Sequence, residues 1–388
     1  MDIDKTSFES SRKVASSGSA NDQSSSTLKE RALEASKSIP GWLTDKEAGE
    51  LFDLVSNIPG DNPICCEIGS YMGKSSVVLG MALLAKRKGK IYCIDPFDLL
   101  SDYYEEVSKK ELGSGNLTRK QFVMDIIRKY GLEGKIELIQ GFSFFVARDF
   151  HQPLDFIFID GDHSFEGVLE DYFDWSGMLK VGGVIAFHDY YKIDDFKRCN
   201  PESYGPARVV DEYVRSNPGW ETKKVVDDLF IAEKLIHQYL EIGFSNGWHK
   251  AESWNDITTR WMYSDAFLLL NRNVDKILNL KLNVMSFCRP RTLEIYSGDL
   301  LLGRWSVPTN FVEISNVPIV PDSRVLRLHV LEGCDRPCDH PELNNPDTRC
   351  LSLAVQNVSL NSTKDKSSVM SSMVSKVKKI GTAFQPTG

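Results

Sequence analysis

Ionisable residues directly follow two apolar runs of the chain, 156–159 and 183–187. If these runs are parallel strands, their carboxyl ends meet at one edge of a sheet, and the residues that follow come together there. Carboxylates and imidazoles at such an edge can accept a proton from a substrate or hold a divalent cation. The five residues concerned are Asp160, Asp162, His163, His188 and Asp189.

A glycine-containing segment, E-I-G-S-Y-M-G-K-S-S over 67–76, lies between the apolar run 64–68 and a helical stretch. A phosphate-binding loop needs four residues between its glycines, but three separate Gly69 from Gly73, which displaces Lys74. A dinucleotide loop presents helix amides to a pyrophosphate, which Glu67 would repel. An acid here suits a cationic ligand. S-adenosylmethionine carries a sulfonium and an ammonium group and no phosphate, so it fits the pattern E-x-G-x-x-x-G.

Two further strand ends extend the predicted cofactor site. Asp95 ends the next apolar run, at the position from which a carboxylate can hold ribose hydroxyls, although this acid alone does not separate NAD from S-adenosylmethionine. After the run 136–139, Gly141 would admit the adenine, and Gln140 or Ser143 would hydrogen-bond it. The expected cofactor-binding residues are Glu67, Gly69, Ser70, Tyr71, Gly73, Asp95, Gln140, Gly141, Ser143 and Asp160.

Together with F-I-D-G-D-H-S-F-E-G at 158–167, these motifs resemble class I S-adenosylmethionine-dependent methyltransferases, in particular the group that carries I-D-G-D-H-S/T after its fourth strand. The resemblance covers residues 41–235. It implies methyl transfer with S-adenosylmethionine as cofactor, on an α/β, Rossmann-like sheet of seven strands whose last strand is antiparallel. The motifs do not name the acceptor.

The metal-dependent catechol-type members of this group have cation ligands at positions that resemble Asp160, His188 and Asp189, and a catalytic lysine at the position of His163. The resemblance therefore implies that His163 is a general base, that Asp160 is catalytic, and that a divalent cation, Mg²⁺ or Mn²⁺, binds here. Because His188 replaces an acid, the site would favour softer ions than magnesium or would be lost. In the alternative interpretation, Asp160 caps the following helix, and His188 and Asp189 form a hydrogen-bonded pair.

Hydrophobic patterning predicts how these residues are positioned. Short apolar runs alternate with helical patterns from about 62 to 233, which is typical of a parallel sheet covered on both faces. The segment 165–179 has apolar residues at helical spacing, with Glu166, Glu170 and Asp171 between them, and predicts a crossover helix. The runs 223–226 and 229–232 predict a hairpin at the sheet edge. Thr44 and Glu47 predict a capping box at the start of an earlier helix.

After about residue 240, apolar and polar residues alternate strictly, which predicts an all-β sandwich. The expected organisation is a disordered serine-rich arm over 1–40, a methyltransferase domain over 41–235, a β-sandwich accessory domain over 240–361, and a flexible serine- and lysine-rich tail over 362–388. The arm contains eleven serines and a single aromatic residue, so we expect it to bury too little surface to fold.

Composition narrows the functional classes. The formal net charge of −8 gives no strongly basic surface, so nucleic acid is not expected as a substrate. No apolar stretch approaches the length of a membrane span. The eight cysteines, with Cys65 and Cys66 inside an apolar run, are expected to be reduced core thiols, which favours a cytoplasmic location. Cys334, Cys338, His340 and Cys350 lack a standard zinc spacing and are expected to structure a loop instead.

The sandwich is similar to modules attached to glycan-modifying bacterial enzymes. With the tryptophans at 248, 254, 261 and 305, which could stack on sugars or simply form the core, this resemblance favours an O-methyltransferase acting on a sugar hydroxyl of a glycan or glycolipid precursor. Two alternatives stay open: an O-methyltransferase for an antibiotic-like or phenolic small molecule, and a non-catalytic glycan-binding protein on a degenerate methyltransferase scaffold. A homo-oligomer is compatible with each of these functions.

Overall fold

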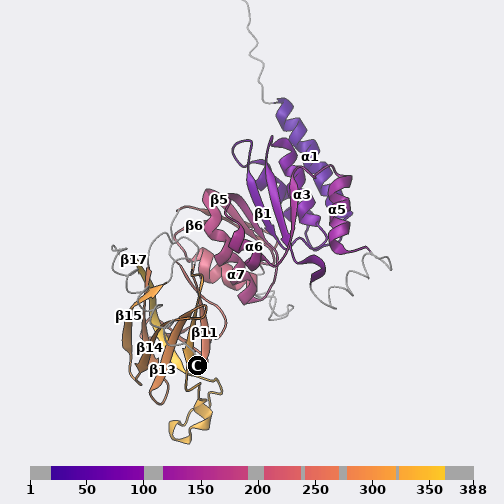
Figure 1. Cartoon of the computed structure of the whole chain (residues 1–388). Coiled ribbons are helices and arrows are strands. Elements are labelled where there is room, and N and C mark those ends of the chain that lie inside the picture. Colours follow the sequence, from indigo (N-terminus) through magenta and orange to yellow (C-terminus); the bar gives the residue numbers. More distant parts are fainter. Residues whose placement is uncertain are drawn as a thin grey trace, which may run out of the picture.

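The computed structural model describes residues 19–99, 117–190, 205–236, 241–270, 278–319 and 323–362. Figure 1 shows two parts: an α/β part built around one sheet, and a second part made almost entirely of strands. The change from continuous apolar runs to alternating ones therefore marks a real change of architecture. The predicted tail beyond residue 362 and the first eighteen residues of the predicted arm lie outside the described residues.

A seven-stranded sheet forms the α/β part, in the order β3-β2-β1-β4-β5-β7-β6. Its first five strands run parallel, and β7 pairs antiparallel with both β5 and β6. This is the predicted sheet, with an antiparallel hairpin at the predicted edge. The strands are β1 (Ile64–Ile68), β2 (Lys90–Asp95), β3 (Ile136–Gln140), β4 (Leu154–Ile159), β5 (Leu179–Phe187), β6 (Trp220–Val226) and β7 (Leu229–Lys234).

Helices cover both faces of this sheet, as the unbroken apolar strands require. Figure 1 shows α1, α3 and α5 on one side and α6 and α7 on the other, and the two buried clusters divide in the same way. The predicted capping box starts α2, where Thr44 and Glu47 exchange hydrogen bonds. The helices are α1 (Ser19–Lys37), α2 (Asp45–Ser56), α3 (Lys74–Ala82), α5 (Arg119–Lys129), α6 (Ser143–Asp149), α7 (Phe165–Trp175) and α8 (Gly205–Val209), with a π-helical segment at Val210–Arg215.

The prediction of a disordered arm over 1–40 is wrong for its second half. Residues Ser19–Lys37 form α1, which packs along α2 and α3. Ala32 and Ala35 are buried in the core, and Ile39 follows them there. Lys29 forms an ion pair with Asp53 of α2 at 2.5 Å. The serine count concealed this helix because alanines allow close helix packing without contributing the large apolar residues on which the expectation rested.

The second part is a sandwich of two five-stranded antiparallel sheets, ordered β15-β12-β17-β10-β9 and β14-β13-β16-β11-β8. The alternating leucines and valines of both sheets point inward and form one buried cluster. The strands are β8 (Ile242–Phe244), β9 (Glu252–Trp254), β10 (Ile257–Trp261), β11 (Asp265–Leu270), β12 (Leu278–Ser286), β13 (Arg291–Ser297), β14 (Leu300–Val307), β15 (Val312–Ile319), β16 (Val325–Val330) and β17 (Leu353–Ser362).

The sandwich docks on α7 through both apolar and polar contacts. Leu269 of β11 belongs to the buried cluster of the α/β part, and Gly243 of β8 faces the ring of Phe173. Arg324 forms an ion pair with Asp174 at 2.9 Å. A cavity of about 940 Å³, lined by α6, α7, β11 and the ends of β13 and β16, lies between the two parts. The interface is therefore partly packed and partly open.

The expectation that every cysteine is reduced is wrong, because Cys334 and Cys350 form a disulfide that closes a loop of the sandwich. Sequence separation alone gives no sign that two cysteines come within bonding distance. Cys65, Cys66 and Cys93 are buried free thiols, as expected. The disulfide removes the argument from cysteines for a reducing compartment, so the cytoplasmic location stays a prediction. In the part of the chain that the structure describes, no helix combines the length and apolar character needed to cross a bilayer.

Candidate active site

Two glycines shape the loop between β1 and α3. Gly69 has φ +84° and Gly73 has φ +81°, the left-handed region that glycine adopts without strain. A Cβ at Gly69 would overlap the backbone carbonyl of Asp160 at the end of β4. The loop therefore passes directly against the β4 end, which only a glycine allows. This brings the predicted cofactor loop into contact with the predicted catalytic residues.

Glu67 lies beneath the loop and is fully buried. Its carboxylate accepts hydrogen bonds from the hydroxyls of Ser70, at 2.9 Å, and of Ser75 and Ser76 at the start of α3. Burial raises the pKa of Glu67, while these hydroxyls and the Cys93 thiol oppose the shift. In this geometry the carboxylate fastens the loop to the first turn of α3. Because its oxygens already accept these hydrogen bonds, the structure does not favour direct contact between Glu67 and a cationic ligand.

Asp95 has a similar position at the end of β2, where it is 6% exposed. Its Oδ2 accepts the loop amides of Ser70 at 2.9 Å and Tyr71 at 2.8 Å, and its Oδ1 accepts the amide of Phe97. Burial raises its pKa against these amides and the nearby charge of Arg119. Asp95 therefore joins the two loops between which a ribose would lie. Hydrogen bonds between Asp95 and ribose hydroxyls stay a prediction.

The loop after β3 meets the same edge of the sheet. The amide of Gly141 donates to the Asp95 carbonyl at 3.0 Å, which places the loop beside the end of β2. The Gln140 side chain accepts from Lys120 at 3.0 Å and donates to the Pro96 carbonyl at 3.5 Å. The hydroxyl of Ser143 donates to Asp171 on α7. Both side chains predicted to bind adenine thus have protein partners already.

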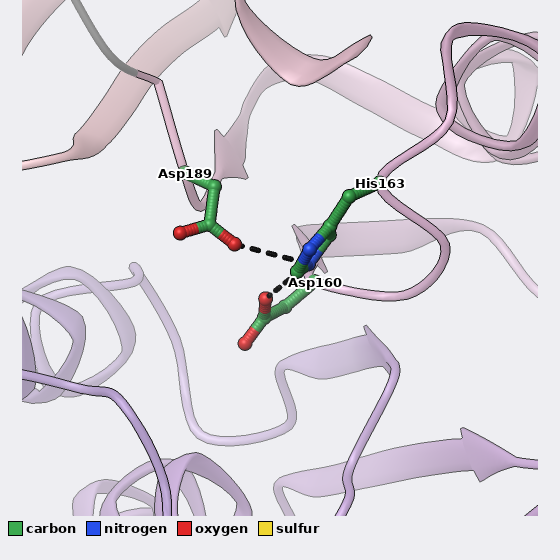
Figure 2. Close-up of side chains that lie close together, drawn as sticks. All are labelled: Asp160, His163 and Asp189. Carbon is green, nitrogen blue, oxygen red and sulfur yellow. Dashed lines mark ion pairs between the residues drawn. The ribbon is translucent and has the colours of Figure 1, made fainter. Parts of the chain in front are cut away.

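The ends of β4 and β5 bring Asp160, His163 and Asp189 together. Figure 2 shows the His163 ring between the two carboxylates. Its Nε2 lies 3.0 Å from Asp189 Oδ2 and 3.5 Å from Asp160 Oδ1. Asp189 takes φ +57°, an uncommon backbone conformation for an aspartate, and this turns the chain at the end of β5. The edge of the sheet therefore carries two acids around one imidazole, as the spacing predicted.

His188 lies behind this group and is 6% exposed. Its Nδ1 is 3.2 Å from Asp160 Oδ1 and 3.4 Å from Asp189 Oδ2. Its Nε2 is 3.5 Å from Glu47 Oε2, the same glutamate that completes the capping box of α2 and accepts the amide of Asp228. Both ring nitrogens therefore face carboxylates, and the imidazole positions the two aspartates from within the protein.

Charge explains the protonation of this cluster. Burial alone would lower the pKa of His163, but hydrogen bonds to Asp160 and Asp189, and their charges, raise it to about 10. The same two acids raise the pKa of His188 well above its usual range against a similar effect of burial. Burial would raise the pKa of Asp189, but its bonds to both histidines hold it below its usual range. The two carboxylates therefore favour the protonated form of His163, which works against the predicted role of this residue as a general base.

The cluster nevertheless has the donor set of a cation site. Asp160, His163 and Asp189 each offer a ligand atom, and these atoms all lie within 4.8 Å of one another. Two carboxylates and an imidazole suit Mn²⁺ better than Mg²⁺, which prefers oxygen. These three residues include His163, whereas the resemblance implied His188 as the third ligand. A cation would compete with the proton for the Nε2 of His163.

Two residues of this edge were missed from the sequence. Glu47 was recognised only as a helix cap, and its contact with His188 joins residues 141 positions apart. Asp171 was expected only as one of the acids between the apolar residues of the crossover helix, but it is 4% exposed and accepts the hydroxyl of Ser143. An acid inside the apolar stripe of a helix was the available signal for Asp171. The sequence held no comparable signal for the second role of Glu47.

Comparison with known proteins gives one family match and several similar solved structures. Residues 66–190 match a family described as a methyltransferase domain. Among solved structures, the chain is similar to a methyltransferase of Podospora anserina bound to S-adenosylhomocysteine, with 12% identity, a TM-score of 0.39, and coverage of 58% of this chain and 99% of that one. It is also similar to an O-methyltransferase of Bacillus cereus in complex with S-adenosylhomocysteine, with 18% identity, a TM-score of 0.39, and coverage of 54% and 91%.

A third similar structure is an O-methyltransferase of Streptomyces achromogenes involved in tomaymycin synthesis, in complex with S-adenosylmethionine, with 14% identity, a TM-score of 0.39, and coverage of 54% of this chain and 89% of that one. The family match spans β1 to the end of β5, and therefore includes the glycine loop, Asp95 and the acid and histidine cluster. The α/β part of the chain thus matches a methyltransferase domain family over residues 66–190, a range that includes strands of the seven-stranded sheet.

Proposed function

We propose that this protein is an O-methyltransferase that transfers the methyl group of S-adenosylmethionine to a hydroxyl of a sugar, in a glycan or glycolipid precursor. The observation that carries the transfer to oxygen is the cluster of Asp160, His163 and Asp189 beside the cofactor loop. A hydroxyl is a poor nucleophile until its proton is removed or its oxygen is bound to a cation. The cluster offers the groups for either route.

The chain's own residues would align the acceptor and manage its proton. When bound, S-adenosylmethionine supplies a methyl group activated by a sulfonium. Transfer would form an O–CH₃ bond as the S–CH₃ bond breaks, and a carboxylate of the cluster or water would take the hydroxyl proton. Alignment contributes much of the rate enhancement in such an in-line displacement. The close approach of Gly69 to Asp160 fixes the distance between the donor loop and the acceptor edge.

A divalent cation fits this proposal through the donor atoms already named. Bound by Asp160, His163 and Asp189, it would lower the pKa of an acceptor hydroxyl that it contacts. His188 and Glu47 would then hold the two carboxylates in place from behind, as partners of metal ligands commonly do. This role uses His163 as a ligand, so the general base would be a carboxylate or water.

Two features support a carbohydrate acceptor. Trp42 is 75% exposed and lies against Tyr71 of the cofactor loop, with ring centroids 5.3 Å apart and ring planes inclined by 34°, so an exposed aromatic surface lies at the edge of the site. Such surfaces bind the apolar face of a sugar ring, and they bind phenols as well. The docked sandwich, which resembles modules of glycan-modifying proteins, favours the sugar. We place the domain limits at 41–235 and 240–361, with α1 as an extension of the first domain.

Methyl transfer from labelled S-adenosylmethionine to a panel of nucleotide sugars, oligosaccharides and phenols tests this proposal. We expect label on a sugar oxygen, with loss of activity after chelation and recovery with Mn²⁺. Asp160→Asn should lower the rate of transfer by about 10³. Asp162→Asn, whose side chain bonds only Ser164 among the described residues, should retain transfer. Label on phenols alone would mean that the acceptor is a phenol and not a sugar. Saturable glycan binding without any transfer would favour the non-catalytic scaffold.

A further inference from the structure

Asp171 is a buried acid that the proposed chemistry does not use. It lies on α7 among apolar residues of the core cluster and is 4% exposed. Its Oδ1 accepts the hydroxyl of Ser143, the first residue of α6. Its Oδ2 faces Gly161, where an added Cβ would lie only 3.2 Å away. The carboxyl group thus sits between the loops that follow β3 and β4.

This carboxyl is poorly satisfied compared with the other buried acids of the sheet edge. Glu67 accepts from three hydroxyls and Asp95 from three amides, whereas Ser143 is the one hydrogen-bond donor to Asp171 within the described part of the chain. Burial raises the pKa of Asp171 to about 8 against the bond from Ser143, and the charges of nearby acids add to the shift. A carboxylate can accept several hydrogen bonds, so Asp171 can accept a further donor.

The location indicates what that donor is. The cofactor's adenine was expected beside Gly141, between the β3 and β4 loops, where Gln140 or Ser143 would bind it. The Gln140 amide already bonds Lys120 and Pro96, and Ser143 gives its proton to Asp171. The group with an acceptor still available at this place is the Asp171 carboxyl. Adenine presents one strong donor on its edge, the exocyclic amine.

We propose that Asp171, held in position by Ser143, accepts a hydrogen bond from the exocyclic amine of the cofactor's adenine, and that it thereby selects adenosyl ligands over inosyl ligands. Inosine carries a carbonyl oxygen at that position, which would face the carboxylate oxygen with no proton between them. A site built to hydrogen-bond one group strongly rejects the analogue that lacks it. The proposal rests on the S-adenosylmethionine assignment and is independent of the acceptor.

Calorimetry on the full chain with S-adenosylhomocysteine and S-inosylhomocysteine tests this proposal without any turnover. At pH 9, where the carboxyl is ionised, we expect the wild type to bind the adenosyl ligand at least ~10-fold more tightly. In Asp171→Asn the amide can turn its own donor toward the inosine oxygen, so the preference should fall to about threefold or less. Glu170→Gln changes the neighbouring acid of α7, which lines the interdomain cavity, and should leave the preference unchanged.

A proton count gives a second measurement. Because the amine favours the ionised carboxyl, binding at pH 7 should release a proton in the wild type, visible as a dependence of the binding heat on the buffer, and this release should disappear in Asp171→Asn. Equal affinity of the wild type for both ligands would overturn the proposal, and this result needs no variant to fold. An unchanged preference in a folded Asp171→Asn would also overturn it. If neither ligand binds, the cofactor assignment fails and this proposal fails with it, whereas a missing sugar acceptor would leave both intact.

Discussion

The acids on the two sides of the sheet edge are used in opposite ways. On the cofactor side, Glu67 and Asp95 are buried, and hydroxyls and amides of the protein surround their carboxylates. On the acceptor side, Asp160 and Asp189 keep 24% and 13% of their side chains exposed and share two imidazoles. The first pair builds the shape of a loop, and the second pair presents charge to whatever enters the site.

This difference shows that two acids at the ends of neighbouring strands can have different roles. The position of an acid in a motif predicts where it lies, but its hydrogen-bond partners decide whether its oxygens are available. We therefore expect substitutions on the cofactor side to change stability and the shape of the loop, and substitutions on the acceptor side to change turnover while the fold persists. Three variants test this contrast and a fourth tests the interface with the sandwich, in order of the expected effect.

Asp160→Asn should have the largest effect on turnover. The amide keeps the size of the side chain but removes the charge that faces His163 and His188. We expect kcat to fall by about 10³, a typical loss when a group that handles a proton or a cation is removed. Thermal unfolding should shift little. Retained turnover in this variant would show that the acceptor-side acids are structural like the cofactor-side pair.

Gly69→Ala should mainly weaken cofactor binding. Its Cβ would overlap the carbonyl of Asp160, and its φ of +84° strains any residue with a side chain. The loop must move away from the β4 end, so we expect the dissociation constant for S-adenosylhomocysteine to rise by about 10². Gly60→Ala is the matched control, because it also has a positive φ, +84°, but no atom lies within 4 Å of the added carbon. Equal losses in both variants would attribute the effect to backbone strain.

Glu67→Gln should reduce stability more than turnover. The amide brings two donors into a buried site where three hydroxyls already donate, so some bonds are lost or reversed. We expect the free energy of unfolding to fall by about 2 kcal/mol. Turnover at saturating cofactor should stay within about fivefold of the wild type, since the group does not face the reaction. A loss of turnover as large as that of Asp160→Asn, without loss of stability, would mean that Glu67 contacts the cofactor directly.

Arg324→Ala tests the interface with the sandwich and should have the smallest effect. It removes the ion pair with Asp174 and the bond to the Ala147 carbonyl. Partly exposed ion pairs contribute little to stability. We therefore expect the free energy of unfolding to fall by about 1 kcal/mol, with no change in turnover on a small acceptor. A selective loss of activity on long oligosaccharides would show that the docked sandwich takes part in acceptor binding.

The sequence was most informative where structure follows from patterns along the chain. Continuous apolar runs such as 64–68 and 156–159 predicted the parallel strands β1 and β4, and strict alternation in 278–284 predicted the sandwich strand β12. Glycine spacing predicted the loop, because a positive φ is a local property of the backbone. These features need no knowledge of distant residues.

Features that depend on distant residues were not predictable. The disulfide between Cys334 and Cys350, the contact of Glu47 with His188 and the burial of Asp171 all join segments that the fold alone brings together. Helix α1 was missed because its alanines have meaning only against the surface of α3 that they cover. The raised pKa of His163 was missed for a related reason, because it depends on two carboxylates that the fold brings next to the ring.

The central claim is that the acceptor-side cluster and the methyl donor form one site. Nuclear magnetic resonance of S-adenosylmethionine labelled with ¹³C in its methyl group, bound to the protein with Mn²⁺ added, measures this directly. The account predicts strong paramagnetic broadening of the bound methyl signal in the wild type and a sharp signal in Asp160→Asn. A bound methyl signal that stays sharp in the wild type at saturating Mn²⁺ would contradict it.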